Sequence, residues 1–227
     1  MKKRIFYTEF AYLFGVIVLA FGTALMEKAD FGMSMVVAPA YILHLKISQF
    51  LPFFSFGMAE YSLQAVIILL MVLILRKFNI SYLFSFITAV FYGFTLDFFM
   101  ILAANLPADN IYLRLIYYVV GMAIGAISIS ALFHTYISPE AYELFVKEVS
   151  SKFGININVF KTIYDCVSLV LSIILSFVFF GLWHFEGVKL GTLFCAFLNG
   201  YLISLATKFF NRYFVFEDKF ALRKYFE

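Results

Sequence analysis

Residues 10–25 read FAYLFGVIVLAFGTAL, and residues 117–132, YYVVGMAIGAISISAL, are a second apolar stretch with the same plan. Around each stretch the order is the same: a long apolar span, an amphipathic segment that follows a serine, and two more apolar spans. Landmark residues of the two copies keep a nearly constant separation of 104 to 107 residues, in the pairs Gly15 and Gly121, Ser34 and Ser138, Phe56 and Phe160, Leu83 and Leu190, and Gly93 and Gly200. This spacing predicts two related halves, residues 10–104 and 112–210, followed by a tail at 211–227.

Six apolar segments are each long enough to cross the hydrocarbon core of a bilayer, which takes about 20 residues. They cover residues 6–26, 57–75, 82–104, 112–133, 159–182 and 188–209. The composition agrees, since 64% of residues are hydrophobic and 14% charged, whereas soluble domains average about 45–50% and about 25%. We therefore expect a single all-α, polytopic membrane domain of six spans. With three spans in each half, the second half would be inverted relative to the first, as in many secondary transporters.

The basic residues are divided unevenly between the two sets of connections. If the N-terminus lies in the cytoplasm, 13 of the 17 lysines and arginines face the cytoplasm. Four face the opposite side, namely Lys28, Lys46, Arg114 and Lys189. Because lysine and arginine concentrate in cytoplasmic loops, the sequence predicts that both termini are cytoplasmic. The net charge of +3 then reflects orientation in the membrane and does not indicate a nucleic-acid partner.

A short amphipathic segment separates the first and second spans of each half. In the second half, Ser138, Pro139 and Glu140 have the properties of a helix start, with Ser138 as the N-cap, and Gly154 those of a stop. The counterpart in the first half follows Ser34 and is more apolar. Either helix could lie flat in the interface or re-enter the protein and direct its positive N-terminus at a ligand. The shared serine favours re-entry, which makes Ser34 and Ser138 candidate site residues that cap two equivalent helix ends.

Ionisable groups inside spans are costly and are therefore candidate functional residues. Glu60 lies one turn into the second span and Asp165 at the matching place in the fifth, with Lys161 four residues before Asp165 on the same helical face. These three would lie at the headgroups if their helices began later. Asp97 in the third span could bind a ligand or a proton, or form a structural hydrogen bond to a neighbouring helix. Asn199 is uncharged but lies deep in the sixth span.

No pattern in the sequence indicates an enzyme, a metal site or a cofactor. The histidines His44, His134 and His184 are dispersed, without paired spacing on one helix. The two cysteines, Cys166 and Cys195, both fall inside spans, where free thiols usually pack as small apolar groups. There is no glycine-rich phosphate loop, no nucleophile elbow and no HExxH sequence.

Small residues recur on one face of the first and fourth spans, at Gly15 and Gly22 and at Gly121 and Gly125. Small residues allow two membrane helices to approach closely. These faces could pack against each other within one chain, or they could join two copies in a homodimer.

Five segments resemble the corresponding parts of the YczE/YyaS/YitT family of bacterial membrane proteins: KADFGMS (28–34), GFTLD (93–97), ISPEAYEL (137–144), KTIYD (161–165) and GTLFCAFLNG (191–200). The resemblance spans almost the whole chain and implies a six-span protein of the bacterial plasma membrane that is compatible with transport, without implying a substrate. One departure is visible. The family pattern after the first Gly-x-Ser is Pro-Trp-Asp, whereas Met35, Val36 and Val37 stand here, so any ligand contact of that aspartate would be absent.

Three functions fit these observations. The first is a secondary transporter or exporter of a small polar metabolite, with Glu60, Asp97, Lys161 and Asp165 at a midplane site between the halves. The second is a substrate-capture subunit of a separate energising complex, and the third is an accessory protein that regulates a membrane partner. A repeat favours the first, because a capture subunit needs no alternating access. Expected partners are the lipid bilayer, an unknown small molecule, and either a second copy or another membrane protein.

Overall fold

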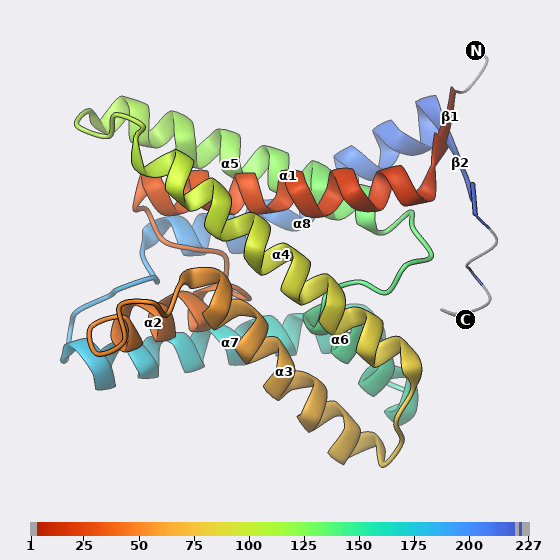
Figure 1. The fold of residues 1–227 in the computed structure, drawn as a ribbon, viewed down its shortest axis with the longest axis horizontal. Helices are drawn as coiled ribbons and strands as arrows, with labels where there is room; N and C mark the ends of the chain where they lie inside the picture. The colour runs from red at the N-terminus through yellow and green to blue at the C-terminus, as the bar shows by residue number, and fades with distance from the viewer. Residues whose placement is uncertain (1–3, 221–222, 224–227) are drawn as a thin grey trace.

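The computed structural model describes residues 4–220 and 223, apart from the side chain of Asn158. Six of its helices are long and apolar enough to cross a membrane. They are α1 (Thr8–Ala29), α3 (Phe56–Leu75), α4 (Ile80–Ala104), α5 (Ile111–Leu132), α7 (Ile157–Phe180) and α8 (Leu190–Tyr213) (Figure 1). Their ends differ from those expected by at most four residues. The six spans are confirmed, and the chain is a multi-pass membrane protein.

Helices α1 and α5 lie side by side, with α5 along the upper edge of the molecule in Figure 1. Their contact is made by glycines: a Cβ atom on Gly22 would lie 2.8 Å from the carbonyl oxygen of Gly121, and one on Gly121 would lie 2.7 Å from that of Gly22. The predicted close approach is therefore confirmed. Since each of these faces is buried against the other within one chain, they are not available to join two copies.

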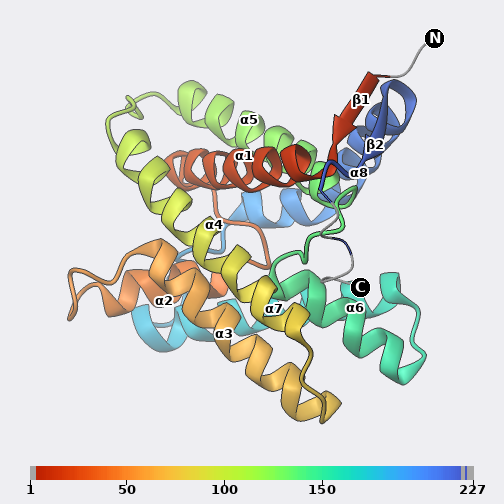
Figure 2. The same cartoon turned by 45° about the vertical axis from the view of Figure 1, so that its right-hand side comes forward.

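Two shorter helices, α2 (Ala38–Ile47) and α6 (Ala141–Phe153), begin inside the molecule and run outward to opposite ends (Figures 1 and 2). The chain before α2 is held at mid-length of α7, where the Ser168 hydroxyl donates to the Met35 carbonyl at 2.7 Å. Val36, at the approach to α2, packs in the same apolar cluster as Ala141 and Tyr142 at the start of α6. Of the two alternatives for these segments, the structure therefore shows the one in which they enter the protein interior.

The expected serine caps are not formed. The N-cap of α2 is Val37 and that of α6 is Glu140, and neither residue caps its helix through its side chain. Ser34 acts through its carbonyl, which accepts the backbone N–H groups that open α2, and Ser138 lies two residues before the cap of α6. The stop is confirmed, because Gly154 ends α6 with a φ of 65°, a left-handed conformation that glycine adopts without strain.

A parallel two-stranded ribbon departs from the all-α expectation. Strand β1 (Arg4–Tyr7) pairs with β2 (Phe214–Glu217), so that both chain ends lie at the same end of the molecule (Figure 1). Beyond β2 the chain is fixed by the Glu9 carboxylate, which accepts the backbone N–H groups of Lys219 at 3.1 Å and Phe220 at 2.9 Å. The predicted tail at 211–227 thus begins as the last turn of α8 and continues as an ordered strand.

Candidate functional site

Buried polar side chains meet where α3, α4 and α6 come together. Glu60 and Gln64 lie one turn apart on α3 and are fully buried, while Glu140 and Tyr142, at the start of α6, are 8% and 3% exposed. We call these four residues the carboxylate cluster. Ionisable groups in the interior of a membrane protein are rare and usually functional, so this cluster is the leading candidate for the site.

The amide of Gln64 links the two carboxylates of the cluster. Its Oε1 accepts the backbone N–H of Ala141 at 3.0 Å, which fixes the orientation of the amide. Its Nε2 therefore faces the acids, and donates to Glu140 Oε2 at 3.2 Å and, at the longer distance of 3.5 Å, to Glu60 Oε2. The Tyr142 hydroxyl donates to the same oxygen of Glu60 at 2.8 Å. Both Oε2 atoms thus have donors from the protein.

The other oxygen of each carboxylate has no such donor. Among the buried side-chain atoms of the described residues, three lack a hydrogen-bond partner: Glu60 Oε1, Glu140 Oε1 and Asp165 Oδ1. Burial, together with the charge of Glu60, raises the pKa of Glu140, which lies outside the six spanning helices, from 4.5 to about 8. The arrangement therefore favours a protonated acid, because an ionised buried carboxylate needs donors or a cation.

An ion-pair group lies beside the carboxylate cluster, between α6 and α7. The Lys161 ammonium is 3.3 Å from Glu143 Oε1 and 3.2 Å from Asp165 Oδ1. The second contact is close enough for an ion pair although it is not aligned as a hydrogen bond. The predicted pairing of Lys161 with Asp165 is thus confirmed. The alternative of later helix starts is wrong, since α3 begins at Phe56 and α7 at Ile157.

Asp97 lies outside the carboxylate cluster and caps the start of α3 from α4. Its Oδ2 accepts the Ser55 hydroxyl at 2.5 Å and its Oδ1 accepts the Gly57 N–H at 2.8 Å. A carboxylate at a helix N-terminus satisfies free N–H groups and the positive end of the helix dipole. It can reach them because Gly57 and Gly93 let the two helices cross so closely that a Cβ on Gly57 would overlap the Gly93 backbone. Of the two alternatives for Asp97, the geometry supports the structural hydrogen bond.

The remaining predicted site residues are placed less centrally. Ser138 borders the cluster through its carbonyl, which accepts the buried hydroxyl of Thr88 on α4 at 3.1 Å, and Ser85 holds the next carbonyl, that of Pro139, at 2.7 Å. Asn199 is half-buried on α8, and no side-chain hydrogen bond involves it within the described residues.

Three residues of the cluster were not expected from the sequence. Gln64 lies four residues after Glu60, and this spacing is the one local signal that could have indicated it. Glu140 and Tyr142 have properties of an ordinary amphipathic helix start. Their approach to Glu60 depends on the packing of α6 against α3, across 76 residues of sequence between Gln64 and Glu140.

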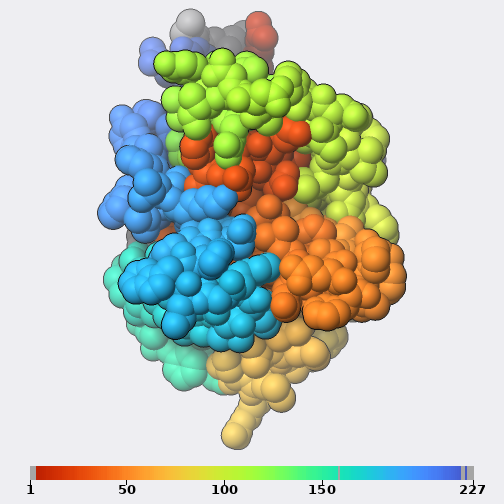
Figure 3. All heavy atoms as spheres, turned by 90° about the vertical axis from the view of Figure 1, so that its left-hand side faces the viewer, coloured from red at the N-terminus to blue at the C-terminus, as the bar shows by residue number. Residues whose placement is uncertain are grey.

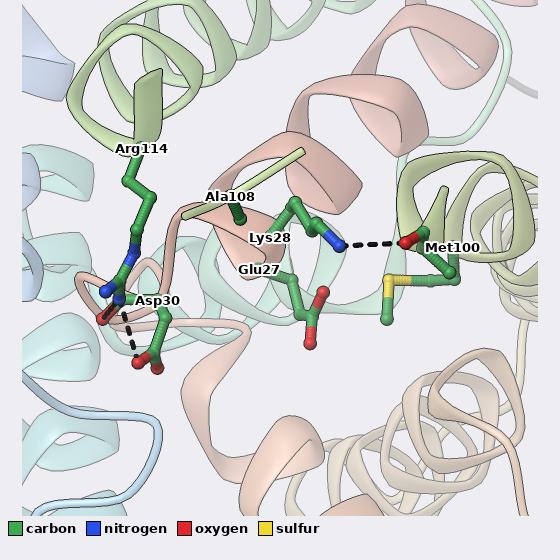
Figure 4. A pocket seen from close by; sticks show the side chains of 7 residues that line it. Glu27, Lys28, Asp30, Met100, Ala108 and Arg114 are labelled. Carbon is green, nitrogen blue, oxygen red and sulfur yellow. Dashed lines mark hydrogen bonds and ion pairs between the residues drawn. The ribbon is translucent and has the colours of Figure 1, made fainter. Parts of the chain in front are cut away.

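A second feature opens at the end of the molecule opposite the chain termini. A depression of about 470 Å³ is lined by Glu27, Lys28, Asp30, Met100, Ala104, Ala108 and Arg114 (Figure 4). Figure 3 views this end, where α1 lies between α5, α8 and α2. Asp30 pairs with Arg114 at 3.0 Å and with Lys189 at 2.5 Å.

The depression continues toward the interior. A much smaller cavity shares Glu27 and Asp30 with it and reaches Met33 and Tyr41, on either side of the start of α2. The Tyr41 hydroxyl donates to Glu27 Oε1 at 3.3 Å across this cavity. The polar residues at the surface are thus connected to the region where α2 begins.

Fold and site define a class: a multi-pass helical membrane protein with two helices that start in its interior and a buried carboxylate cluster at the start of one of them. The chain belongs to DUF6198, a family of unknown function, whose model matches residues 6–208. No curated protein and no solved structure matches the chain. The family match covers all the helices except the end of α8, and it adds no substrate or activity.

Proposed function

We propose that this protein is a secondary transporter or exporter of a small polar metabolite in the bacterial plasma membrane, with both termini in the cytoplasm. The observation that carries the proposal is the carboxylate cluster at the inner end of α6. A buried site at a helix start, deep among spanning helices, is the arrangement found in transporters that bind substrate near the midplane. The division of basic residues supports the orientation.

Inverted repeats are part of the proposal, and the packing supports them. Suppose that α1 to α4 correspond in order to α5 to α8. The contact of α1 with α4 then corresponds to that of α5 with α8, and the contact of α2 with α7 corresponds to that of α6 with α3. The contact of α1 with α5 corresponds to itself, because exchanging the two halves exchanges these two helices. All three relations hold in the structure, as a two-fold relation between halves requires.

The halves differ in the packing of α4, which contacts α3 and α6, whereas α8 makes no contact of similar extent with α7 or α2 among the described residues. Gly93 of α4 meets Gly57 of α3. Gly200 is the counterpart of Gly93 on α8, and a Cβ atom added there would have no described heavy atom within 4 Å. A difference of this kind between related halves is expected when a transporter is seen in one of its two access states. The ion pairs of Asp30 with Arg114 and Lys189 join the two halves, and we infer that they close the outer entrance in this state.

Ligand binding by the purified protein tests the proposal. We would screen amino acids, organic acids, amines, nucleobases and vitamins by thermal shift, since a ligand at 100 times its Kd stabilises a protein by about 2.7 kcal/mol. Uptake or counterflow of any hit into proteoliposomes would follow. Glu60→Gln should abolish transport, whereas Glu217→Gln, at an exposed position of β2, should retain it. Unchanged transport by both Glu60→Gln and Glu140→Gln would show that the site is elsewhere.

A subunit or accessory protein that acts with a membrane partner is the second candidate. The observation in its favour is the low burial of α7 and α8, of which 17% and 22% lie inside the protein, together with the open surface at Gly200. Co-purification with an ATPase complex, combined with no transport by the isolated protein, would favour this candidate over the first.

A further inference from the structure

We propose that Glu60 and Glu140 act as one binding site for a single exchangeable proton, and that protons are therefore the ions to which this protein couples substrate movement. The coupling rests on the proposed function above. The proton site itself does not, because it is derived from the geometry of the cluster and can be measured without a substrate.

The hydrogen bonds leave one buried oxygen of each carboxylate without a donor, so the pair requires at least one proton. Gln64 cannot turn its amide, since its oxygen is held by the Ala141 N–H, so both carboxylates share one NH₂ group. Glu60 receives one more donor, the Tyr142 hydroxyl. The Oε1 atoms of Glu60 and Glu140 receive none and are buried. Two neighbouring carboxylates in such surroundings titrate as a pair, in which the first ionises and the second keeps its proton.

Within the described residues, no surplus positive charge faces the pair. The titratable groups that face it from the surrounding elements are Glu143 from α6, Lys161, Tyr164 and Asp165 from α7, Tyr92 from α4 and Tyr12 from α1. Lys161 is the one cation among them, and it is already paired with Glu143 and Asp165. The ion-pair group as a whole therefore carries one negative charge and cannot neutralise two ionised glutamates.

A proton fits this site better than a metal ion does. Calcium takes six to eight oxygen ligands and magnesium takes six, whereas the cluster offers two carboxylate oxygens without partners. The nearest carbonyls of the α6 approach, those of Ser138 and Pro139, already accept the hydroxyls of Thr88 and Ser85. No group of three or more His, Cys, Asp or Glu residues that could hold a metal occurs within the described residues.

Release of the proton has a mechanical consequence. Glu60 belongs to α3 and Glu140 to the cap of α6, so two ionised carboxylates would repel across the contact between these helices. Gln64 bridges the same contact through the first N–H of α6. The start of α6 remains fixed to α4 by Ser85 and Thr88. Deprotonation therefore weakens the contact of α3 with α6 in particular.

Infrared difference spectroscopy on a pH change, with the full-length protein in proteoliposomes and no substrate, tests the proton site. The wild type should gain one protonated-carboxyl band per molecule when the pH falls. Glu60→Gln and Glu140→Gln should each lose this band, and Glu217→Gln should retain it. Tyr142→Phe removes a donor to the charged form of Glu60, so it should keep the band and shift its titration to higher pH.

Three results would overturn the inference: no such band in the wild type, a band unchanged in both glutamine variants, or a band displaced by sodium at fixed pH. Size-exclusion chromatography identifies any variant that does not fold, and Tyr142→Phe then still tests the assignment through the direction of its shift. If the band behaves as expected but the protein transports no substrate, the result would support the proton site and contradict the transporter proposal. The two can therefore fail separately.

Discussion

Gln64 shows how a single side chain can connect a helix start with two acids. Its carbonyl oxygen accepts the backbone N–H of Ala141, which as the first residue of α6 has no acceptor within the helix, while its NH₂ group faces Glu60 and Glu140. Glutamine is suited to this place because it offers an acceptor and two donors on one rigid plane. Glutamate here would add a third negative charge, and leucine would leave the Ala141 N–H without a partner.

The protonation of Glu140 makes stability depend on pH. Its pKa is about 8 in the folded protein and 4.5 when the chain is unfolded, so the folded state binds the proton more tightly. This contribution to stability is complete below pH 4.5 and is lost as the pH rises through about 8. We expect the melting temperature to fall across this range, and to fall less in Glu140→Gln. Equal slopes in the two proteins, measured by differential scanning fluorimetry, would contradict the protonation.

Replacement of Asp97 should affect stability more than binding. Asp97→Ala removes the acceptor of Ser55 and of the Gly57 N–H, and loss of a partner for buried donors costs about 1–3 kcal/mol. Asp97→Asn keeps one acceptor oxygen and should cost less. Thermal melts of both variants measure this order, and ligand binding should persist in whichever variant folds. Loss of binding at an unchanged melting temperature would instead assign Asp97 to the site.

Sequence reasoning identified part of the site and not its centre. Glu60, Lys161 and Asp165 were indicated because a charge within an apolar span is visible locally. The pairing of Lys161 with Asp165 follows from helical spacing alone. Glu140 lay outside every span and looked like part of a surface helix, so nothing in its surroundings indicated burial. That information resides in the packing of α6 against α3, which involves residues far apart in the chain.

Among the helices, glycine marks the places where backbones touch. At Gly57 a Cβ would overlap the Gly93 carbonyl, whereas at Gly200 it would meet open space. Gly57→Ala should therefore separate α3 from α4 and displace Asp97 from its cap, and we expect a loss of at least about 1–3 kcal/mol, as for overpacked cores. Gly200→Ala is the control at the α8 counterpart of Gly93, the residue that Gly57 contacts, and it should be neutral or slightly stabilising because alanine favours the helix. Comparable melting temperatures for the two variants would contradict the crossing.

The elements divide into those with a local signal and those without one. Long apolar runs predicted all six spanning helices, and Gly154 predicted the end of α6. The caps were predicted incorrectly because Ser138 has a favourable sequence for a cap, while the hydroxyls of Ser85 and Thr88 bind the Pro139 and Ser138 carbonyls to α4 before α6 begins. Strands β1 and β2 have no counterpart in the hydropathy pattern, since four-residue strands are stabilised here by a distant partner.

For the molecule as a whole, orientation in the membrane can be tested with single cysteines. The background is Cys166→Ser with Cys195→Ser, which removes the two free thiols. Asp109→Cys, in the exposed turn between α4 and α5, should react in intact cells with a reagent that does not cross membranes. Lys77→Cys, in the turn at the other end of α4, should react only after lysis. The reverse pattern would mean that both termini lie outside.

The ribbon of β1 and β2 sets a condition on how the protein is made. Arg4 is synthesised before the six spans and its partner Phe214 only after all of them, so this contact cannot form until every span has been made. The ribbon can therefore close only when an even number of crossings has brought both ends to one side of the bilayer. A chain that skips or misinserts one span would leave two unpaired strand edges, which expose N–H and C=O groups to proteases and to other chains. The ribbon thus distinguishes molecules in which all six spans are inserted from molecules in which one of them is missing.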